Sequence, residues 1–202
     1  MSANIEVVAV DVGGVLFTDG TKKLLAELRG DERDAIRGIL RGSQARALKC
    51  GLLSAAGFWR WAESGLPEGW GADRLRQAWF GAYQPIVAIH ELVAALRANS
   101  RPPRIVAFSG NFGERVTWLE QRFAFRHLFD SEVWSDEVGA TKPSQVFVDA
   151  LIEHCGVAPA QIVYLDDKAS ALAPAQARGI HGVLVDSAQA CRTALQGWGL
   201  VR

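Results

Sequence analysis

Residues 7–20 read VVAVDVGGVLFTDG, and this stretch decides the predicted fold. An apolar run over residues 7–10 ends on a single acid, Asp11, and a second apolar run follows Gly13 and Gly14. Such a continuous apolar run is typical of a parallel strand that helices cover on both faces. An acid at its end lies at the carboxyl edge of the sheet, where open α/β folds bind their ligands.

Short β-branched runs alternate with longer helical patterns along the rest of the chain, which favours an α/β sheet with crossover helices. The apolar runs predict strands at residues 5–10, 104–108, 162–165 and 182–185, and a weaker one at 132–135. The helical stripes predict helices at residues 86–98, 144–154, 171–178 and 187–195, the last capped by Ser187.

Residues 18–83 break this alternation, because they hold helix-like pieces and no convincing strand. The pieces are residues 22–28, 32–40, 55–63 and 72–82, separated by glycines and Pro67. We therefore predict a Rossmann-like parallel sheet core, formed by residues 1–17 and 84–202, with an inserted all-helical cap at 18–83. Extra helices packed on the outside of the sheet are the alternative.

Composition excludes several classes of function. The 202 residues carry 22 basic and 22 acidic side chains, and this zero net charge disfavours nucleic acid or an anionic membrane as partner, although it is compatible with a local basic patch. No apolar run approaches the ~20 residues that span a bilayer, and the first residues lack a signal-peptide pattern. Three scattered cysteines fit a reducing, cytoplasmic compartment. The oligomeric state stays open.

Polar residues end the other predicted strands as well. Ser109 and Gly110 follow the strand at 104–108, the pair Asp166 and Asp167 follows the strand at 162–165, and Lys142 precedes a helix. Singly, such residues are more often helix caps or turn residues. Together they predict one site, because clustered carboxylates repel unless a divalent cation lies between them.

The residue types at this edge fit phosphate chemistry. Mg²⁺ prefers oxygen ligands and bridges one or two carboxylates to a phosphate. A lysine and a serine hydroxyl suit the remaining phosphate oxygens. An aspartate in line with phosphorus can attack it and form an aspartyl-phosphate that water then cleaves.

Four motifs give the chain a resemblance to the haloacid dehalogenase-like hydrolase superfamily over its whole length. They are DVGGVLF at 11–17, FSGN at 108–111, GATKPSQVF at 139–147 and YLDDKASAL at 164–172. The order and spacing are similar to those of the branch with a small helical cap after the first strand. That branch includes sugar-phosphate phosphatases and the phosphatase domain of soluble epoxide hydrolases.

The resemblance implies a role for each residue. Asp11 would be the nucleophile and a metal ligand, and Ser109 with the Gly110 backbone N–H would bind phosphate. Lys142 would steady the nucleophile and the transferring phosphoryl group. Asp166 and Asp167 would hold Mg²⁺, with Asp167 as the direct ligand and Asp166 bound directly or through water. The substrate would be a small phosphorylated metabolite.

Gly13 departs from the family pattern, because relatives commonly carry an acid/base aspartate two residues after the nucleophile. Gly13 can offer only its backbone carbonyl to the metal. Loss of acid–base help typically costs ~10²–10⁴-fold in rate, so we expect slower turnover with metal and phosphate binding retained. A substrate with a good leaving group, or another acid such as Asp19, would compensate. Ala171 is a second departure, since relatives often have a polar residue there.

Two other functions stay open. A metal-independent dehalogenase would use the same aspartate to attack carbon, but such relatives usually carry an aromatic residue at position 13 and would not need Asp166 and Asp167. A catalytically impaired binding or regulatory protein is compatible with Gly13. Within the insert, Trp59, Arg60 and Trp61 are either packing residues of the cap or contacts of the substrate.

Overall fold

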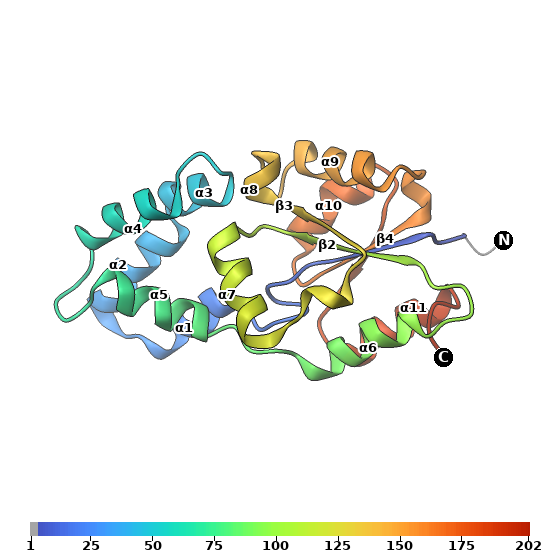
Figure 1. Cartoon of the computed structure of the whole chain (residues 1–202), viewed down its shortest axis with the longest axis horizontal. Helices are drawn as coiled ribbons and strands as arrows, with labels where there is room; N and C mark the ends of the chain where they lie inside the picture. Colours follow the sequence, from blue (N-terminus) through green and yellow to red (C-terminus); the bar gives the residue numbers. More distant parts are fainter. Residues whose placement is uncertain (1–3) are drawn as a thin grey trace.

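A parallel sheet of five strands forms the centre of the computed structural model, which describes residues 4–202 (Figure 1). The strand order is β3-β2-β1-β4-β5, so the first strand lies in the middle. The strands are β1 (Val7–Val10), β2 (Arg104–Ser109), β3 (Ser131–Trp134), β4 (Ile162–Asp166) and β5 (His181–Leu184). The α/β fold class is confirmed, and each strand lies within two residues of its predicted range. The predicted core segment also includes residues 1–3, which lie outside the described residues.

Two apolar clusters cover the two faces of the sheet. Successive side chains of a strand point to opposite faces, so Val7 and Ala9 belong to one cluster and Val8 and Val10 to the other. Helices α9 (Gln145–Cys155) and α10 (Ala169–Ala177) cover the first face, and α6 (Val87–Arg97) and α11 (Ala188–Gly197) cover the second (Figure 1). Burial on both faces explains why the strands are apolar throughout.

Residues 18–83, all of which the structure describes, contain helices and no strand. They form a helical layer beyond one end of the sheet (Figure 1). Its helices are α1 (Gly20–Glu27), α2 (Gly30–Arg41), α3 (Ser43–Lys49), α4 (Ala55–Glu63) and α5 (Ala72–Gly81). We call residues 18–83 the helical segment; its status as a separate cap domain stays a prediction.

The helical segment leaves and rejoins the core at one point. The Thr18 N–H donates to the Gln84 carbonyl at 2.9 Å, and the Gln84 N–H donates to Thr18 Oγ1 at 3.0 Å. The same hydroxyl donates to the Ala82 carbonyl at 2.8 Å. These bonds hold the two ends of the segment side by side, directly after the loop that carries Gly13.

Three helices were not among the predicted elements: α3, α7 (Gly113–Phe123) and the short α8 (Ser135–Val138). The buried residues of α7 include Val116 and Leu119, which share a helical face three residues apart. Its start on glycine and its β-branched and aromatic residues weaken the helical signal in sequence. None of the helices described between residues 4 and 202 has the length and apolar character needed to cross a membrane.

Candidate active site

Asp11 follows β1 directly and is buried at the carboxyl edge of the sheet. Its Oδ1 accepts hydrogen bonds from the Ser109 hydroxyl at 2.7 Å and from the Val12 N–H at 2.8 Å. The Lys142 ammonium lies 2.9 Å from the same oxygen. Among the described residues no hydrogen bond reaches Oδ2, so one oxygen of the carboxylate is held and the other is left for a ligand.

Ser109 and Gly110 come to Asp11 from the neighbouring strand. Val10 pairs with Ala107 of β2, so the residues that follow these two positions extend past the same edge of the sheet. Ser109 is the last residue of β2 and is buried. Ser109 and Gly110 both line the cavity that Asp11 faces; their role in binding phosphate stays a prediction.

Lys142 lies between two carboxylates. Its Nζ is 2.9 Å from Asp11 Oδ1 and 2.6 Å from Asp166 Oδ2, and all three side chains are largely buried. An ammonium placed between two carboxylates attracts both of them. Lys142 therefore offsets part of the repulsion between the two carboxylates and is held rigidly beside the candidate nucleophile.

Asp166 and Asp167 differ in how many partners they already have. Asp166 ends β4 and is fully buried; its Oδ2 accepts from Lys142 and from the Tyr164 hydroxyl, and its Oδ1 accepts from the Lys168 N–H at 2.8 Å. Asp167 is half-buried and has one ion pair, with the Lys168 ammonium at 3.2 Å. Asp167 thus has more capacity left for a further ligand than Asp166 has.

Gly14 allows the Asp167 side chain to approach the loop that follows β1. A Cβ built on Gly14 would stand 2.4 Å from Cγ of Asp167, and the Gly14 φ of +100° lies in the region that favours glycine. Any side chain at position 14 would displace the Asp167 carboxylate. Gly14, the second glycine of the opening stretch, is therefore required by Asp167, the acid that follows β4.

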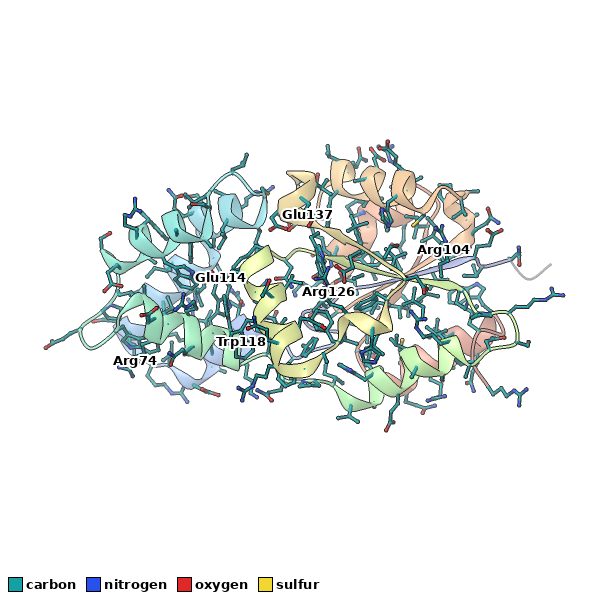
Figure 2. All side chains as sticks on the ribbon, viewed as in Figure 1. Arg74, Arg104, Glu114, Trp118, Arg126 and Glu137 are labelled. Atoms are coloured by element: carbon teal, nitrogen blue, oxygen red, sulfur yellow. The ribbon has the colours of Figure 1, made fainter. Side chains whose placement is uncertain are left out.

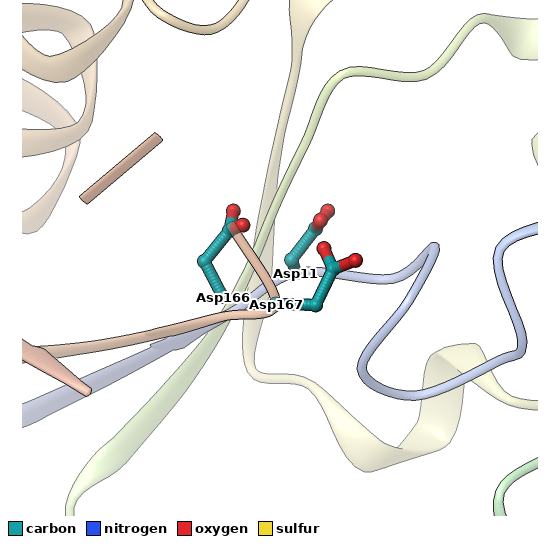
Figure 3. A group of neighbouring side chains, drawn as sticks. All are labelled: Asp11, Asp166 and Asp167. Atoms are coloured by element: carbon teal, nitrogen blue, oxygen red, sulfur yellow. The ribbon is translucent and has the colours of Figure 1, made fainter. Parts of the chain in front are cut away.

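Three carboxyl groups, those of Asp11, Asp166 and Asp167, gather at this edge (Figure 3). One oxygen from each lies within 4.8 Å of the others. Burial raises the pKa of Asp11, and the nearby Asp166 charge raises it further against the opposing effect of Lys142. Burial also raises the pKa of Asp167. Burial thus disfavours the charged form of these carboxylates. A hard divalent cation such as Mg²⁺, which prefers oxygen ligands, would stabilise that form.

Gly13 lies beside the same cavity. No donor among residues 4–202 forms a hydrogen bond to its carbonyl oxygen, which leaves this oxygen free for a metal ion. The aromatic ring that lines the cavity next to Gly13 belongs to Tyr83, at the end of the helical segment. Burial raises the pKa of the Tyr83 hydroxyl, so the phenol is protonated at neutral pH.

A cavity of about 430 Å³ lies over these residues. One wall consists of the polar residues at the strand ends. Other lining residues come largely from the helical segment and include basic side chains that we did not single out from the sequence. They are Arg41, Arg46 and Lys49, and they are joined by Arg115 from α7.

Other residues discussed in the sequence take structural positions. The Asp19 carboxylate accepts from the Lys22 N–H at 3.0 Å and so caps α1, although it also lines the cavity and pairs with Lys168. Ala171 is buried at the cavity wall. Arg60 and Trp61 are exposed outside it.

Trp59 contacts the core and not the cavity. Its indole N–H donates to Glu114 of α7 at 2.7 Å, and Arg76 lies 3.2 Å from the same carboxylate. Glu114 and Trp118 lie where α7 meets the helical segment (Figure 2). Trp59 therefore packs the helical segment against the core, which was one of its two predicted roles.

Comparison with known proteins places the fold. No family model matches the chain. An uncharacterised protein of Dictyostelium discoideum is 33% identical over 162 residues, which are 77% of this chain and 69% of that protein. A HAD-family enzyme of Bacteroides thetaiotaomicron superimposes with a TM-score of 0.74 at 18% identity, over 89% of this chain and 93% of that chain.

The Bacteroides enzyme is also known in complex with magnesium and inorganic phosphate, and that complex superimposes with a TM-score of 0.72 at 18% identity. The L-2-haloacid dehalogenase of Xanthobacter autotrophicus, with chloropropionic acid covalently bound, superimposes with a TM-score of 0.65 at 18% identity, over 98% of this chain and 85% of that chain. Both superpositions extend over most of this chain, at 89% and 98% of its length. The chain therefore has the fold of the haloacid dehalogenase-like superfamily, as its four motifs predicted.

Proposed function

We propose that the chain is a Mg²⁺-dependent phosphatase that hydrolyses a small phosphorylated metabolite through an aspartyl-phosphate on Asp11. The observation that carries the proposal is the set of contacts around Asp11. One carboxylate oxygen is fixed by Ser109 and Lys142, the other has no protein partner, and a cavity lies above it. A positioned carboxylate with a free oxygen is suited to nucleophilic attack on phosphorus.

Mg²⁺ would be held by Asp11, the Gly13 carbonyl oxygen and Asp167, with Asp166 bound directly or through water. Asp167 has the greater free capacity, whereas both oxygens of Asp166 already accept hydrogen bonds. When bound, Mg²⁺ would neutralise phosphate charge and orient the phosphoryl group. The magnesium and phosphate complex of the Bacteroides enzyme with the same fold supports this choice of ion and ligand.

In the proposed reaction, Asp11 Oδ2 attacks phosphorus while the bond from phosphorus to the leaving oxygen breaks. Lys142, with three N–H donors, holds Asp11 in line and donates to a phosphoryl oxygen, and the single proton of the Ser109 hydroxyl turns from Asp11 to the bound phosphoryl group. Water then attacks the aspartyl-phosphate and releases inorganic phosphate and free Asp11. The proton for the leaving oxygen does not come from position 13, since Gly13 has no side chain.

A dehalogenase is the second candidate, because the Xanthobacter enzyme shares the fold. It would use Asp11 against carbon and leave the pair Asp166 and Asp167 without a role in catalysis. A binding protein with impaired chemistry is the third candidate. We also propose a cytoplasmic location, which suits the three buried, unpaired cysteines Cys50, Cys155 and Cys191.

The test is hydrolysis of p-nitrophenyl phosphate and a panel of sugar, acyl and nucleotide phosphates, each with Mg²⁺ and with a chelator. We expect phosphate release that depends on Mg²⁺ and is lost in Asp11→Asn. Metal-independent chloride release from 2-chloropropionate would replace the proposal with the dehalogenase. Inactivity of the folded protein on both panels would favour the binding protein.

A further inference from the structure

Arg115 is a buried cation that has no acidic partner among residues 4–202. Its residue is only 2% exposed, yet it lines the cavity. Its Nε donates to Asn111 Oδ1 at 2.7 Å, and its Nη2 lies 3.5 Å from the Gly110 carbonyl, which is a weak contact at best. Its Nη1 is buried and has no hydrogen-bond partner among the described residues. A guanidinium in this state has unused capacity for an anion.

Aromatic rings hold the Arg115 guanidinium in position. Its central carbon lies 4.7 Å from the ring centre of Tyr83, 4.9 Å from that of Phe112 and 5.0 Å from that of Trp79. These distances are in the range of cation–π contacts. The rings orient the guanidinium, but they do not neutralise its charge or engage its N–H groups. Arg115 is therefore preorganised to bind an anion from outside the chain.

Lys49 brings a second unpaired cation to the same cavity. It is the last residue of α3, and the described residues form no ion pair with it. Its backbone carbonyl accepts from the Ser135 hydroxyl at 2.6 Å, which anchors this end of α3 to the core. Burial lowers the pKa of Lys49 to about 8, and the positive charge of Arg115 acts in the same direction. Two cations that repel each other in a shared cavity are both stabilised by one anion.

Arg41 and Arg46 add exposed positive charge at the same wall. The Asp19 carboxylate, which also faces the cavity, is already engaged by Lys22 and Lys168. The wall formed by the helical segment and α7 is therefore basic, although the whole chain has no net charge.

We propose that the substrate carries a second oxyanion, a carboxylate or a phosphate, apart from the phosphoryl group that Asp11 attacks, and that Lys49 and Arg115 bind it. This inference rests on the proposed function. The phosphoryl group already has Ser109 and Lys142 as partners at Asp11. A cavity of about 430 Å³ lies in the range that holds a whole small ligand, so both groups of such a substrate fit together.

Three substrates of matched length test the inference: 3-hydroxypropyl phosphate, 2-carboxyethyl phosphate and propane-1,3-diyl bisphosphate. We expect kcat/KM of the wild type to be about 10- to 100-fold higher for either or both doubly charged compounds than for the hydroxyl compound. The compound with the higher value identifies which oxyanion the site takes. Equal kcat/KM for all three would overturn the inference and leave the phosphatase intact.

Variants assign the preference to Lys49. Lys49→Gln should reduce the preference about tenfold, Lys49→Arg should retain it, and Lys23→Gln, on an exposed lysine of α1 outside the cavity, should leave it unchanged. Arg115→Lys is informative only if its thermal unfolding matches the wild type, because Arg115 packs among aromatic rings. An equal loss on all three substrates in Lys49→Gln would contradict the assignment.

Binding of phosphonates, which cannot be hydrolysed, separates this inference from the proposed function. Titration calorimetry with Mg²⁺ compares 3-phosphonopropanoate with 3-hydroxypropylphosphonate on the wild type and Lys49→Gln. Tighter binding of the carboxylate that is lost in Lys49→Gln would support the site even if no substrate turned over. Equal binding of both phosphonates would count against it.

Discussion

The ring of Tyr83 occupies the space next to position 13: a Cβ built on Gly13 would stand 3.1 Å from Cε1 of Tyr83. This contact is tight but does not forbid a side chain, since the Gly13 backbone is not in the left-handed region. The ring would have to move by a few tenths of an ångström. The glycine at this position and the buried tyrosine at the end of the helical segment are therefore packed as a pair.

Gly13→Asp should restore acid–base chemistry. We expect a rise in kcat of up to about 10²–10⁴-fold on alkyl phosphates, whose leaving oxygen needs a proton. Little change is expected on p-nitrophenyl phosphate, whose leaving group needs none. Gly13→Asn is the matched control, because it crowds Tyr83 equally and transfers no proton. Equal rates for the two variants on alkyl phosphates would contradict the prediction.

Asp11→Asn should remove turnover while the fold survives. The amide oxygen can still accept from Ser109, but a neutral amide is a poor nucleophile, so we expect a loss of roughly 10³-fold or more in kcat. An assay of phosphate release checks the loss of turnover. Thermal unfolding, monitored by circular dichroism, checks that the fold survives. Activity retained in a folded variant would remove Asp11 from the nucleophilic role.

Lys142→Met should destabilise the metal-free protein by about 3–5 kcal/mol at neutral pH, because Asp11 and Asp166 would face each other without their shared cation. Millimolar Mg²⁺ should recover part of this loss, since a bound divalent cation replaces the missing charge. Urea unfolding with Mg²⁺ and with a chelator measures both effects. Lys142→Arg, which keeps the charge, should lose less stability. A loss that Mg²⁺ does not reduce would argue against a metal site at these acids.

The preference for doubly charged substrates should fall as the pH rises above about 8. Lys49 loses its proton there, because burial and the Arg115 charge lower its pKa, while Asp19 and Asp11 act in the opposite direction and Lys168 in the same one. The ratio of kcat/KM values between doubly and singly charged substrates reports this free-enzyme pKa. Lys49→Arg should keep the ratio constant to pH 9.5, and a parallel fall in that variant would exclude Lys49 as the cause.

The same pKa shift affects stability with a definite sign. The unfolded lysine, with a pKa near 10.5, holds its proton between pH 8 and 10.5 more than the folded one does. The contribution of Lys49 to the free energy of unfolding therefore rises across this window. Urea unfolding of the wild type and Lys49→Gln at pH 7.5 and 9.5 should show the difference between the two proteins changing in favour of the wild type at the higher pH.

The sheet and its chemical edge could be predicted from sequence because each depends on local patterns. Apolar strands that are buried on both faces are recognised by composition, and Asp11, Ser109 and Asp166 each stand at the end of such a run. Parallel pairing then brings these ends together, whatever the intervening sequence is. Lys142 contacts Asp11 and Asp166 because it lies at the same edge of the sheet.

The basic wall could not be predicted, because nothing local marks it. Lys49 and Arg115 are 66 positions apart and resemble ordinary helix residues until the fold brings both to the same cavity. Tyr83 likewise lies beside Gly13 only because the helical segment packs against the core. The indirect signal was the helical segment itself, because packing of the cap was one of the two roles open to Trp59 and Trp61, but the sequence did not tell which polar residues such packing would bury.

The paired hydrogen bonds between Thr18 and Gln84 hold together the two points at which the chain enters and leaves the helical segment. Because its ends already touch, a turn of a few residues would join them without moving any strand. Changes in the length or sequence of this segment can therefore alter which molecules fit the cavity. The strands that carry the candidate active site keep their pairing. Apart from Arg115 of α7, the residues that we propose for selectivity thus lie on a different stretch of the chain from those that we propose for reactivity, and the two stretches are free to change in evolution at their own rates.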